Sequence, residues 1–469
     1  MKEISSLEIC NRIKFENPWW EKNTIDLEKK SLRPRAYLEL LLKLVGQKDP
    51  VRAVVLMGPR RVGKSVLLHH AIQAMLDGGK PSNTICYMSI DSPLYAGKSL
   101  DSLLHLFGTI TSRERFDDCL IIFDEIQYLK GWETHLKKLV EDHPKAKFIA
   151  SGSAAAALRL KSIESGAGRF SDFMLPPLTF HEFLLLTDKN ELATQAKDPK
   201  NPGALESLNR EFVNYLNYGG YPEAALSETI KSDPQRFIRS DIIDKVLLRD
   251  LPGLYGIEDI QELNRLFTML AYNTGNEVSL ENLSQGSGVA KNTIKRYLEY
   301  LEAAFLIVIL NRVDQRGKLF KRANFFKVYL TNPSMRCALF DPVTTDHQAM
   351  GQLTETAVIS QWLHSASFKS LYYSRWQKGE VDLVYHNGHN IDWCTEVKWT
   401  NRFFERPGEL RPLARFCKEN KIAAAPLVTT IDKTGKQTID DVEIEFIPVS
   451  LHCYLLGYNT VFHNVRTWT

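Results

Sequence analysis

The sequence predicts an α/β fold divided into several domains. The first part of this prediction comes from the pattern of apolar runs, and the second comes from the chain length. Between residues 53 and 150, short apolar runs with the length of buried strands alternate with longer runs that have helical spacing. Such alternation is typical of a parallel sheet with helices on both faces. The chain of 469 residues is also too long for one ordinary core, so we expect roughly two to four domains.

The composition is that of a globular protein, with 44% hydrophobic residues, 25% charged residues and a net charge of +3. This charge is too small to indicate a nucleic-acid partner, so only local basic patches can argue for one. The seven cysteines form no C-x-x-C pair, which favours reduced thiols over disulfides or a zinc site. The N-terminus lacks an apolar signal core, and no apolar run approaches the ~20 residues of a membrane helix. We therefore expect a cytoplasmic protein with no membrane partner.

A phosphate-binding loop follows the first apolar run, residues 53–57. The pattern G-x4-G-K-S is formed by Gly58, Pro59, Arg60, Arg61, Val62, Gly63, Lys64 and Ser65, and a helix-forming series comes next. The glycines allow backbone N–H groups to point at phosphate oxygens, and the helix adds its positive N-terminal end. Lys64 supplies charge to the β- and γ-phosphates, and Ser65 supplies a hydroxyl for Mg²⁺. The loop therefore predicts ATP and Mg²⁺ as cofactors.

An acidic pair, Asp124 and Glu125, ends the apolar run at 119–123. At the end of a strand, Asp124 would hold Mg²⁺ through its hydration shell, and Glu125 would orient or deprotonate the attacking water. Parallel strands place their carboxyl ends, and with them an active site, at one edge of the sheet. Ser151, after the strand at 147–150, is expected at the same edge. Ser151 and Ser153 are candidate γ-phosphate sensors, with a simple turn as the alternative.

The order of these motifs resembles a prokaryotic family of AAA+-type ATPases. The loop, the acidic pair and Ser-Gly-Ser at 151–153 are followed by Gly168-Arg169-Phe170 and by LPPLTFHEFLLL at 175–186. Members of that family also carry a winged helix and a C-terminal domain like the PD-(D/E)XK nucleases. The resemblance implies that Arg169 is an arginine finger or sensor, with a surface salt bridge as the alternative. A finger acting between subunits would require a homo-oligomer, and the sequence leaves this open.

The resemblance implies four parts in chain order. They are an ATPase core at 1–186, a helical lid at 187–272, a winged helix at 273–340 and a nuclease-like α/β domain at 341–469. The polar stretch 187–206, with proline and glycine, predicts an exposed loop or linker at the start of the lid.

The winged-helix prediction depends on two helical stretches, which begin near Ser279 and at Lys291. The second helix exposes four polar residues that could lie in a major groove: Lys291, Asn292, Lys295 and Arg296. Basic residues surround the predicted wing at 314–317 and could contact DNA phosphates: Arg312, Arg316, Lys318, Lys321, Arg322 and Lys327. The alternative is a module that only bridges domains, with the basic residues as a solvated face.

A second candidate site lies in the last part of the chain. Two strand-like runs flank a turn at 386–389, and a hairpin would bring Asp382 near Glu396 and Lys398, which share one strand face. Two carboxylates form an oxygen site for Mg²⁺ or Mn²⁺, and a lysine can stabilise charge on a phosphodiester. The spacing D-x13-E-x-K resembles the PD-(D/E)XK signature, and Glu355 matches the acidic residue on that fold's first helix. The resemblance implies catalysis by Asp382, Glu396 and Lys398, with a metal ion held by Glu355, Asp382 and Glu396.

The leading hypothesis is an ATPase whose nucleotide state controls a metal-dependent nuclease acting on DNA. The alternative is an ATP-driven switch that binds DNA or a protein, with an inactive nuclease-like domain. A third reading is a nucleotide-dependent signalling scaffold with no nucleic acid. Strandedness, sequence preference and oligomeric state stay open at this stage.

Overall fold

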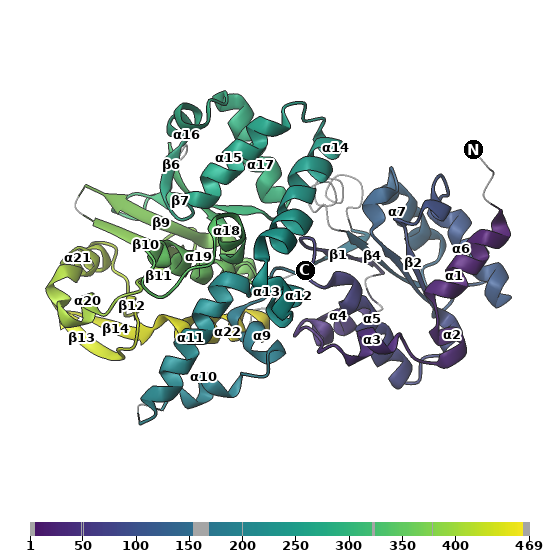
Figure 1. Cartoon of the computed structure of the whole chain (residues 1–469), viewed down its shortest axis with the longest axis horizontal. Coiled ribbons are helices and arrows are strands. Elements are labelled where there is room, and N and C mark those ends of the chain that lie inside the picture. The colour runs from purple at the N-terminus through teal and green to yellow at the C-terminus, as the bar shows by residue number, and fades with distance from the viewer. Residues whose placement is uncertain are drawn as a thin grey trace. The chain divides into compact units, whose positions relative to one another are not determined.

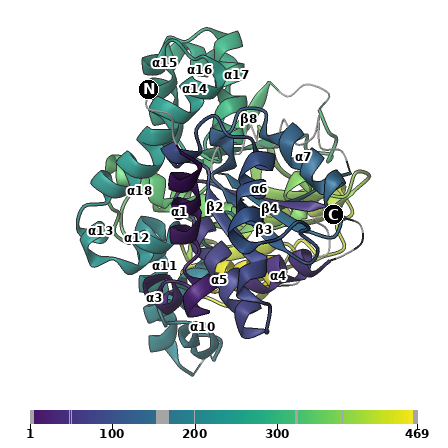
Figure 2. The same ribbon diagram turned by 90° about the vertical axis from the view of Figure 1, so that its right-hand side faces the viewer.

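A computed structural model describes residues 5–47, 49, 51–152, 168–198, 200–320, 324–377 and 379–462 (Figures 1 and 2). The chain divides into two compact units, one ending at Pro176 and the other beginning at Pro177. The division therefore lies ten residues before the predicted end of the ATPase core at 186, because helix α9 (Phe180–Leu186) packs in the core of the second unit.

The N-terminal unit is built on a five-stranded sheet in the order β2-β3-β4-β1-β5, and every neighbouring pair is parallel. Its strands are β1 (Ala53–Met57), β2 (Ile85–Ser89), β3 (Leu120–Asp124), β4 (Lys147–Gly152) and β5 (Phe170–Met174). The connecting helices are α4 (Leu38–Gly46), α5 (Lys64–Asp77), α6 (Leu100–Thr111) and α7 (Trp132–Asp142). Near-continuous apolar strands are buried on both faces in such a sheet. The predicted α/β fold is confirmed for this unit.

Two N-terminal helices cover the edge of this sheet, α1 (Ser6–Glu16) and α2 (Trp19–Lys22), and a third, α3 (Leu27–Ser31), packs on α5. Figure 2 shows α1 running beside β2, the strand at the edge. The Asn17 side chain accepts from the N–H of Tyr87 at 2.7 Å and donates to its C=O at 2.8 Å. The indole N–H groups of Trp19 and Trp20 both donate to the C=O of Ile85. Side chains thus satisfy backbone groups that an uncovered edge strand would leave unpaired.

The second unit contains a nine-stranded sheet in its described part, in the order β13-β14-β12-β11-β10-β9-β7-β8-β6. The strands are β6 (Glu277–Ser279), β7 (Ile307–Val313), β8 (Phe325–Leu330), β9 (Leu371–Trp376), β10 (Gly379–His386), β11 (Ile391–Glu396), β12 (Leu427–Thr430), β13 (Gly435–Ile439) and β14 (Val442–Pro448). The sheet runs across the domain boundary predicted at 340, because β7 pairs in parallel with β9. The region expected to form a winged helix and the C-terminal α/β region therefore share one sheet.

Helices gather at both ends of this sheet. Figure 1 shows α15 (Ile260–Tyr272), α16 (Leu280–Ser287) and α17 (Lys291–Ala303) at the β6 end, and α20 (Arg402–Glu405) and α21 (Arg411–Glu419) at the β13 end. A separate apolar core joins α9, α11 (Pro202–Tyr218), α19 (Met350–Trp362) and α22 (Val449–Phe462). Further helices of this unit are α12 (Pro222–Leu226), α13 (Glu228–Ser232), π-helical turns at Gln235–Asp244 and Val246–Asp250, α14 (Leu251–Tyr255) and α18 (Ser334–Phe340).

The prediction of a loop or linker at 187–206 is wrong in part. This stretch contains α10 (Glu191–Gln195) and the first turn of α11. Ala193 of α10 is buried, and α10 packs along α11. A tertiary contact thus orders a segment whose polar composition favours a loop. None of the helices in the described part of the chain combines the length and apolar character that crossing a membrane requires.

Candidate functional site

The predicted phosphate loop connects the end of β1 to the start of α5. A Cβ atom on Gly58 would lie 2.2 Å from the carbonyl oxygen of Leu175, which is closer than any side chain can tolerate. Gly63 has a φ of +91°, in the left-handed region that glycine enters without strain. The sequence therefore has glycine where this backbone path requires it.

Two basic side chains hold the loop in shape. The ammonium of Lys64 is buried and donates to the carbonyl oxygens of Gly58 at 3.0 Å and Pro59 at 2.8 Å. The guanidinium of Arg35 donates to the carbonyl oxygens of Val62 at 2.7 Å and Pro176 at 3.1 Å. Arg35 was not predicted to belong to this site, because it lies before the first strand and fits no phosphate-loop pattern.

Asp124 is the centre of the hydrogen-bond network, and it is only 2% exposed. One of its carboxylate oxygens accepts from the Ser65 hydroxyl at 2.6 Å and from the Tyr87 hydroxyl at 2.6 Å. The other oxygen accepts from the hydroxyl of Ser151. The structure therefore brings Ser65, Asp124 and Ser151 together at the carboxyl ends of their strands. Tyr87 was missed, although a phenol in an otherwise apolar strand is a signal that its hydroxyl has a partner.

The donor set around Asp124 fits Mg²⁺. The Ser65 hydroxyl and the Asp124 carboxylate are adjacent oxygen ligands, which is the chemistry that this hard cation prefers. Glu125 follows directly with a φ of +53°, an uncommon backbone conformation for a glutamate, and its carboxylate accepts from the amide of Gln127. Such conformations are concentrated at functional positions.

Arg169 lies away from this network. It precedes β5, and its carbonyl oxygen accepts from the N–H of Ala53 at the amino end of β1. The phosphate loop begins at the opposite end of the same strand, after Met57. The Arg169 side chain instead pairs with Glu141 on the surface, at 3.2 Å. The structure thus does not bring Arg169 to the loop of its own chain. Ser153, which with Ser151 is a candidate γ-phosphate sensor, lies outside the described residues.

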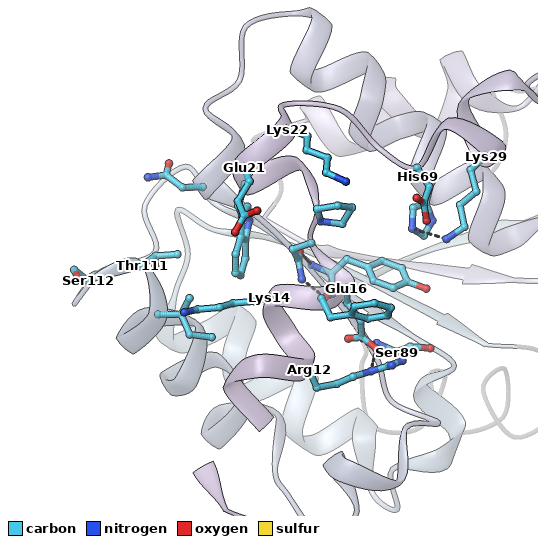
Figure 3. Close-up of a pocket in the computed structure, with 18 residues that line it drawn as sticks. Arg12, Lys14, Glu16, Glu21, Lys22, Lys29, His69, Ser89, Thr111 and Ser112 are labelled. Carbon is cyan, nitrogen blue, oxygen red and sulfur yellow. Dashed lines mark hydrogen bonds and ion pairs between the residues drawn. The ribbon is translucent and has the colours of Figure 1, made fainter. Parts of the chain in front are cut away.

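A cleft of about 920 Å³ opens beside β2, and part of its wall reaches the network (Figure 3). In Figure 3 the side chains of Lys29 and His69 point toward one another, and their nitrogen atoms are 3.0 Å apart. The other ring nitrogen of His69 lies 2.7 Å from the carbonyl oxygen of Ser65, so it carries the hydrogen. Burial, and then the charge of Lys29, lower the pKa of His69 to about 4. A neutral imidazole therefore links α3 to the first turn of α5.

The second predicted site forms where β10 pairs with β11 as the expected antiparallel hairpin. One carboxylate oxygen of Asp382 accepts from the Lys398 ammonium at 2.8 Å and from the N–H of Val397 at 2.9 Å. The same ammonium lies 2.7 Å from Glu396. Asp382, Glu396 and Lys398 are thus brought together, as the alternation of side chains along a strand predicts.

A second lysine completes the site. Lys327 was predicted to contact phosphates from the wing, and this prediction is wrong, because Lys327 lies on β8 and is 3% exposed. Its ammonium lies 2.8 Å from Glu355, 2.6 Å from Glu380 and 3.5 Å from Asp382. We call the six side chains the carboxylate cluster: Lys327, Glu355, Glu380, Asp382, Glu396 and Lys398. A lone lysine in the apolar run FFKVYL was the signal for a buried, paired charge. Lys321 and Arg322 lie outside the described residues.

Burial and charge shift the protonation of this cluster in different directions. Burial, supported by the nearby charge of Asp382 and opposed by Lys398, raises the pKa of Glu396 to about 8. Burial also acts to raise the pKa of Asp382, but Lys398 and Lys327 together lower it below its ordinary value. Burial opposes the charge of Lys327, yet its anionic neighbours hold the pKa of this ammonium well above its ordinary value. Near neutral pH, Asp382 and Lys327 are charged and Glu396 is largely protonated.

As arranged, the cluster does not fit Mg²⁺ or Mn²⁺. One oxygen of Asp382 faces Lys327 and the other faces Lys398, while Glu355 accepts from Lys327 and from the hydroxyl of Tyr329. Among the residues that the structure describes, no group of three or more potential ligands is arranged to hold a metal ion. The two ammonium groups donate hydrogen bonds to the carboxylate oxygens that the predicted metal ion would need.

The first site lies in a segment that matches a known family of domains. The family model of an AAA domain matches residues 51–184, which hold the phosphate loop, Asp124 and Ser151. Residues 51–184 are an AAA domain of the P-loop ATPase class. A second family model, described as a domain of unknown function (DUF8612), matches residues 209–346, from α11 through β6, β7 and β8.

The similarity to curated proteins extends beyond the AAA domain. An uncharacterized protein of Methanocaldococcus jannaschii is 26% identical over 85% of this chain and 87% of its own length. An uncharacterized protein of Haemophilus influenzae is 27% identical over 63% of this chain and 71% of its own length. Each of these matches is longer than the N-terminal unit and therefore includes part of the second unit.

Among solved structures, the similarity is weaker. The Aeropyrum pernix ORC1 protein, solved in complex with DNA, is 11% identical with a TM-score of 0.32 over 68% of this chain and 95% of that chain. The Aeropyrum pernix ORC2 protein, in ADPNP–ADP complexes, is 15% identical with a TM-score of 0.36 over 66% and 91%.

Proposed function

We propose that the protein is an ATPase that works as a nucleotide-driven switch, with the second unit acting on DNA. The observation that supports it best is the convergence of Lys64, Ser65 and Asp124 at the carboxyl ends of β1 and β3 in the AAA domain. A hydroxyl and a carboxylate beside a buried lysine are the set of groups that binds Mg²⁺ and nucleotide phosphates in this class.

The residues of this chain would share the work of hydrolysis. Backbone N–H groups of the loop would bind phosphate oxygens, and Lys64 would exchange its bonds to two loop carbonyls for bonds to the β- and γ-phosphates. Ser65 and Asp124 would hold Mg²⁺, which when bound neutralises charge on the phosphates. Glu125 would orient the attacking water. Tyr87 and Ser151 would keep the Asp124 carboxylate in its position.

ATP turnover by the Lys64→Ala variant tests this proposal. We expect a loss on the order of 100-fold or more in kcat, because the variant lacks the charge that faces the phosphates. Lys43→Ala, which removes an exposed lysine from α4, is the matched control and should keep the wild-type rate. Undiminished turnover in Lys64→Ala would refute the assignment of the nucleotide site.

Contact with DNA is the second part of the proposal, and α17 is the element that supports it. Lys295 and Arg296 are exposed on this helix, whereas Lys291 pairs with Glu281. Binding of a DNA duplex should weaken steeply as salt rises, and Lys295→Ala with Arg296→Ala should reduce both the affinity and the salt dependence. Binding that is undetectable even at low salt would favour a signalling scaffold.

Metal-dependent cleavage of DNA is a second candidate function. It is supported by the convergence of Glu355, Asp382, Glu396 and Lys398, the four positions that the PD-(D/E)XK resemblance implies. The test is cleavage of plasmid and single-stranded DNA with Mg²⁺ or Mn²⁺, with and without ATP, by wild type, Asp382→Ala and Lys398→Ala. Cleavage lost in both variants would establish the nuclease. Intact ATP hydrolysis without any cleavage would favour the switch that binds without cutting.

Two further features belong to the proposal. Arg169 would act as a finger only between subunits, which requires a homo-oligomer, and its surface ion pair with Glu141 is the alternative role. Mixed samples of Lys64→Ala and Arg169→Ala subunits would then recover part of the activity that each variant lacks alone. A cytoplasmic location is supported by the seven cysteines, which are all present as free thiols.

A further inference from the structure

We propose that Lys327 is an internal cation that excludes divalent metal ions from the carboxylate cluster. The inference concerns the same carboxylates as the second candidate function and opposes that function in the wild-type chain, because an excluded metal ion cannot support cleavage there. These side chains lie where a metal site is expected, yet the part of the chain that the structure describes holds no such site.

The position of the Lys327 ammonium is the first support. It reaches Glu355 on α19 and both Glu380 and Asp382 on β10, so that one cation bridges two elements. It lies over the ring of Tyr373, 5.4 Å from the centroid, and the side chain is 4% exposed. The ammonium thus lies among carboxylates of the cluster and is shielded from solvent.

The charges of the cluster give the second support. Two ammonium groups offset half of the negative charge that four carboxylates can carry, and a divalent cation would lie within a few ångströms of both positive charges. Mg²⁺ and Mn²⁺ also need several carboxylate or water oxygens, but both Asp382 oxygens already accept from ammonium groups. Metal binding therefore requires the removal of an ammonium group.

The contrast between the two lysines indicates which one matters. Lys398 is 26% exposed and occupies the position that the nuclease signature assigns to lysine. Lys327 is buried, lies outside that signature, and extends from a β8 strand whose other residues are mostly apolar. A methionine could occupy the same space without charge. Burying an unpaired charge is costly, so the Lys327 ammonium is retained in this strand only because the carboxylates pair with it.

The experiment measures Mn²⁺ binding by electron paramagnetic resonance on the full chain without nucleotide. We expect Lys327→Met to bind one Mn²⁺ at least about tenfold more tightly than wild type, because one competing charge is gone. Lys327→Met with Asp382→Asn should lose that ion, which assigns it to the cluster and not to the AAA domain. Lys318→Met, which removes an exposed lysine from the loop before β8, should bind Mn²⁺ as wild type does.

Lys327→Met removes the ammonium group that pairs with Glu355 and Glu380 and can fail to fold, so a second variant is needed. Lys327→Met with Glu355→Gln removes one charge of each sign and should fold, with Asp382 and Glu396 left to bind Mn²⁺. Mn²⁺ should also raise the melting temperature of both variants by more than it raises that of wild type.

Two results would overturn the inference. If wild type binds Mn²⁺ as tightly as the variants, Lys327 does not compete, and the nuclease candidate is unaffected. If the folded double variant binds no Mn²⁺, the cluster is an ion-pair network without a hidden metal site. The DNA-cleavage assay on wild type then decides separately whether the nuclease candidate fails as well.

Discussion

The side chain of Asn17 offers a direct test of how the N-terminal helices support the nucleotide site. It is 1% exposed and makes three hydrogen bonds, two with the backbone of Tyr87 and one with the carbonyl oxygen of Ile13 at 2.7 Å. Asn17→Ala removes all three and leaves the N–H and C=O of Tyr87 without partners on the edge of β2. Because Tyr87 also holds Asp124, the damage should extend to the site itself.

The magnitude follows from the number of bonds. Three hydrogen bonds at roughly 1 kcal/mol each give a loss of about 3 kcal/mol in local stability. Hydrogen exchange measured by mass spectrometry is the suitable assay, because it reports opening of β2 without requiring the two units to unfold together. A loss of about 3 kcal/mol corresponds to exchange on the order of 100-fold faster at the Tyr87 amide.

Asn11→Ala is the matched control, since Asn11 is an exposed asparagine on α1, the helix that Asn17 caps at its C-terminal end. It should leave the exchange of β2 unchanged and the rate of ATP turnover at the wild-type value. Equal exchange rates at Tyr87 in Asn17→Ala and wild type would refute the argument that side chains of the N-terminal segment stabilise the edge strand.

Three further predictions follow from the same contacts. Gly58→Ala should weaken ATP binding at least about tenfold in a calorimetric titration, because its Cβ would meet the Leu175 carbonyl oxygen and displace the loop. Tyr87→Phe should lower kcat about tenfold with little change in KM, because it frees the Asp124 carboxylate to turn. Glu396 has a pKa of about 8 against an ordinary 4.5, so it binds a proton more readily in the folded chain. Its contribution to stability is therefore full below pH 4.5 and is lost as the pH rises through 8, so the melting temperature should fall over this window in wild type and less in Glu396→Gln.

Each of these predictions has a clear contrary result. Gly46→Ala is the control for the loop, because a Cβ atom at Gly46 meets nothing within 4 Å, and equal ATP affinity in both glycine variants would contradict the steric argument. A kcat of Tyr87→Phe equal to that of wild type would mean that Asp124 needs no support from Tyr87. Parallel pH profiles of the melting temperature in wild type and Glu396→Gln would mean that Glu396 does not take up the proton.

The features that the sequence alone determined are local. The phosphate loop is eight consecutive residues between a strand and a helix, so its chemistry needs no knowledge of distant contacts. The order of strands and helices in the AAA domain follows from alternating apolar runs. Asp382, Glu396 and Lys398 could be placed together because one hairpin joins them, and the side-chain period of a strand is fixed.

Other features depended on contacts between distant parts of the chain. Tyr87 donates a hydrogen bond to Asp124, which lies 37 positions later in the sequence, and Lys327 donates one to Asp382, which lies 55 positions later. No periodicity relates such residues, since their distance is set by which strands become neighbours in a sheet. Arg169 shows the same limit, because only the parallel register of β1 and β5 decides that it lies at the end opposite the loop.

The carboxylate cluster shows the difference most clearly. The sequence supplied the residue types of a metal site, because aspartate, glutamate and lysine recur there at a characteristic spacing. Whether those oxygens are available to a metal ion depends on the pairing of β7 with β9, which extends the sheet that also holds β8 and Lys327. Charge balance inside a buried site is a sum over every neighbour in space, so only the tertiary structure could decide it.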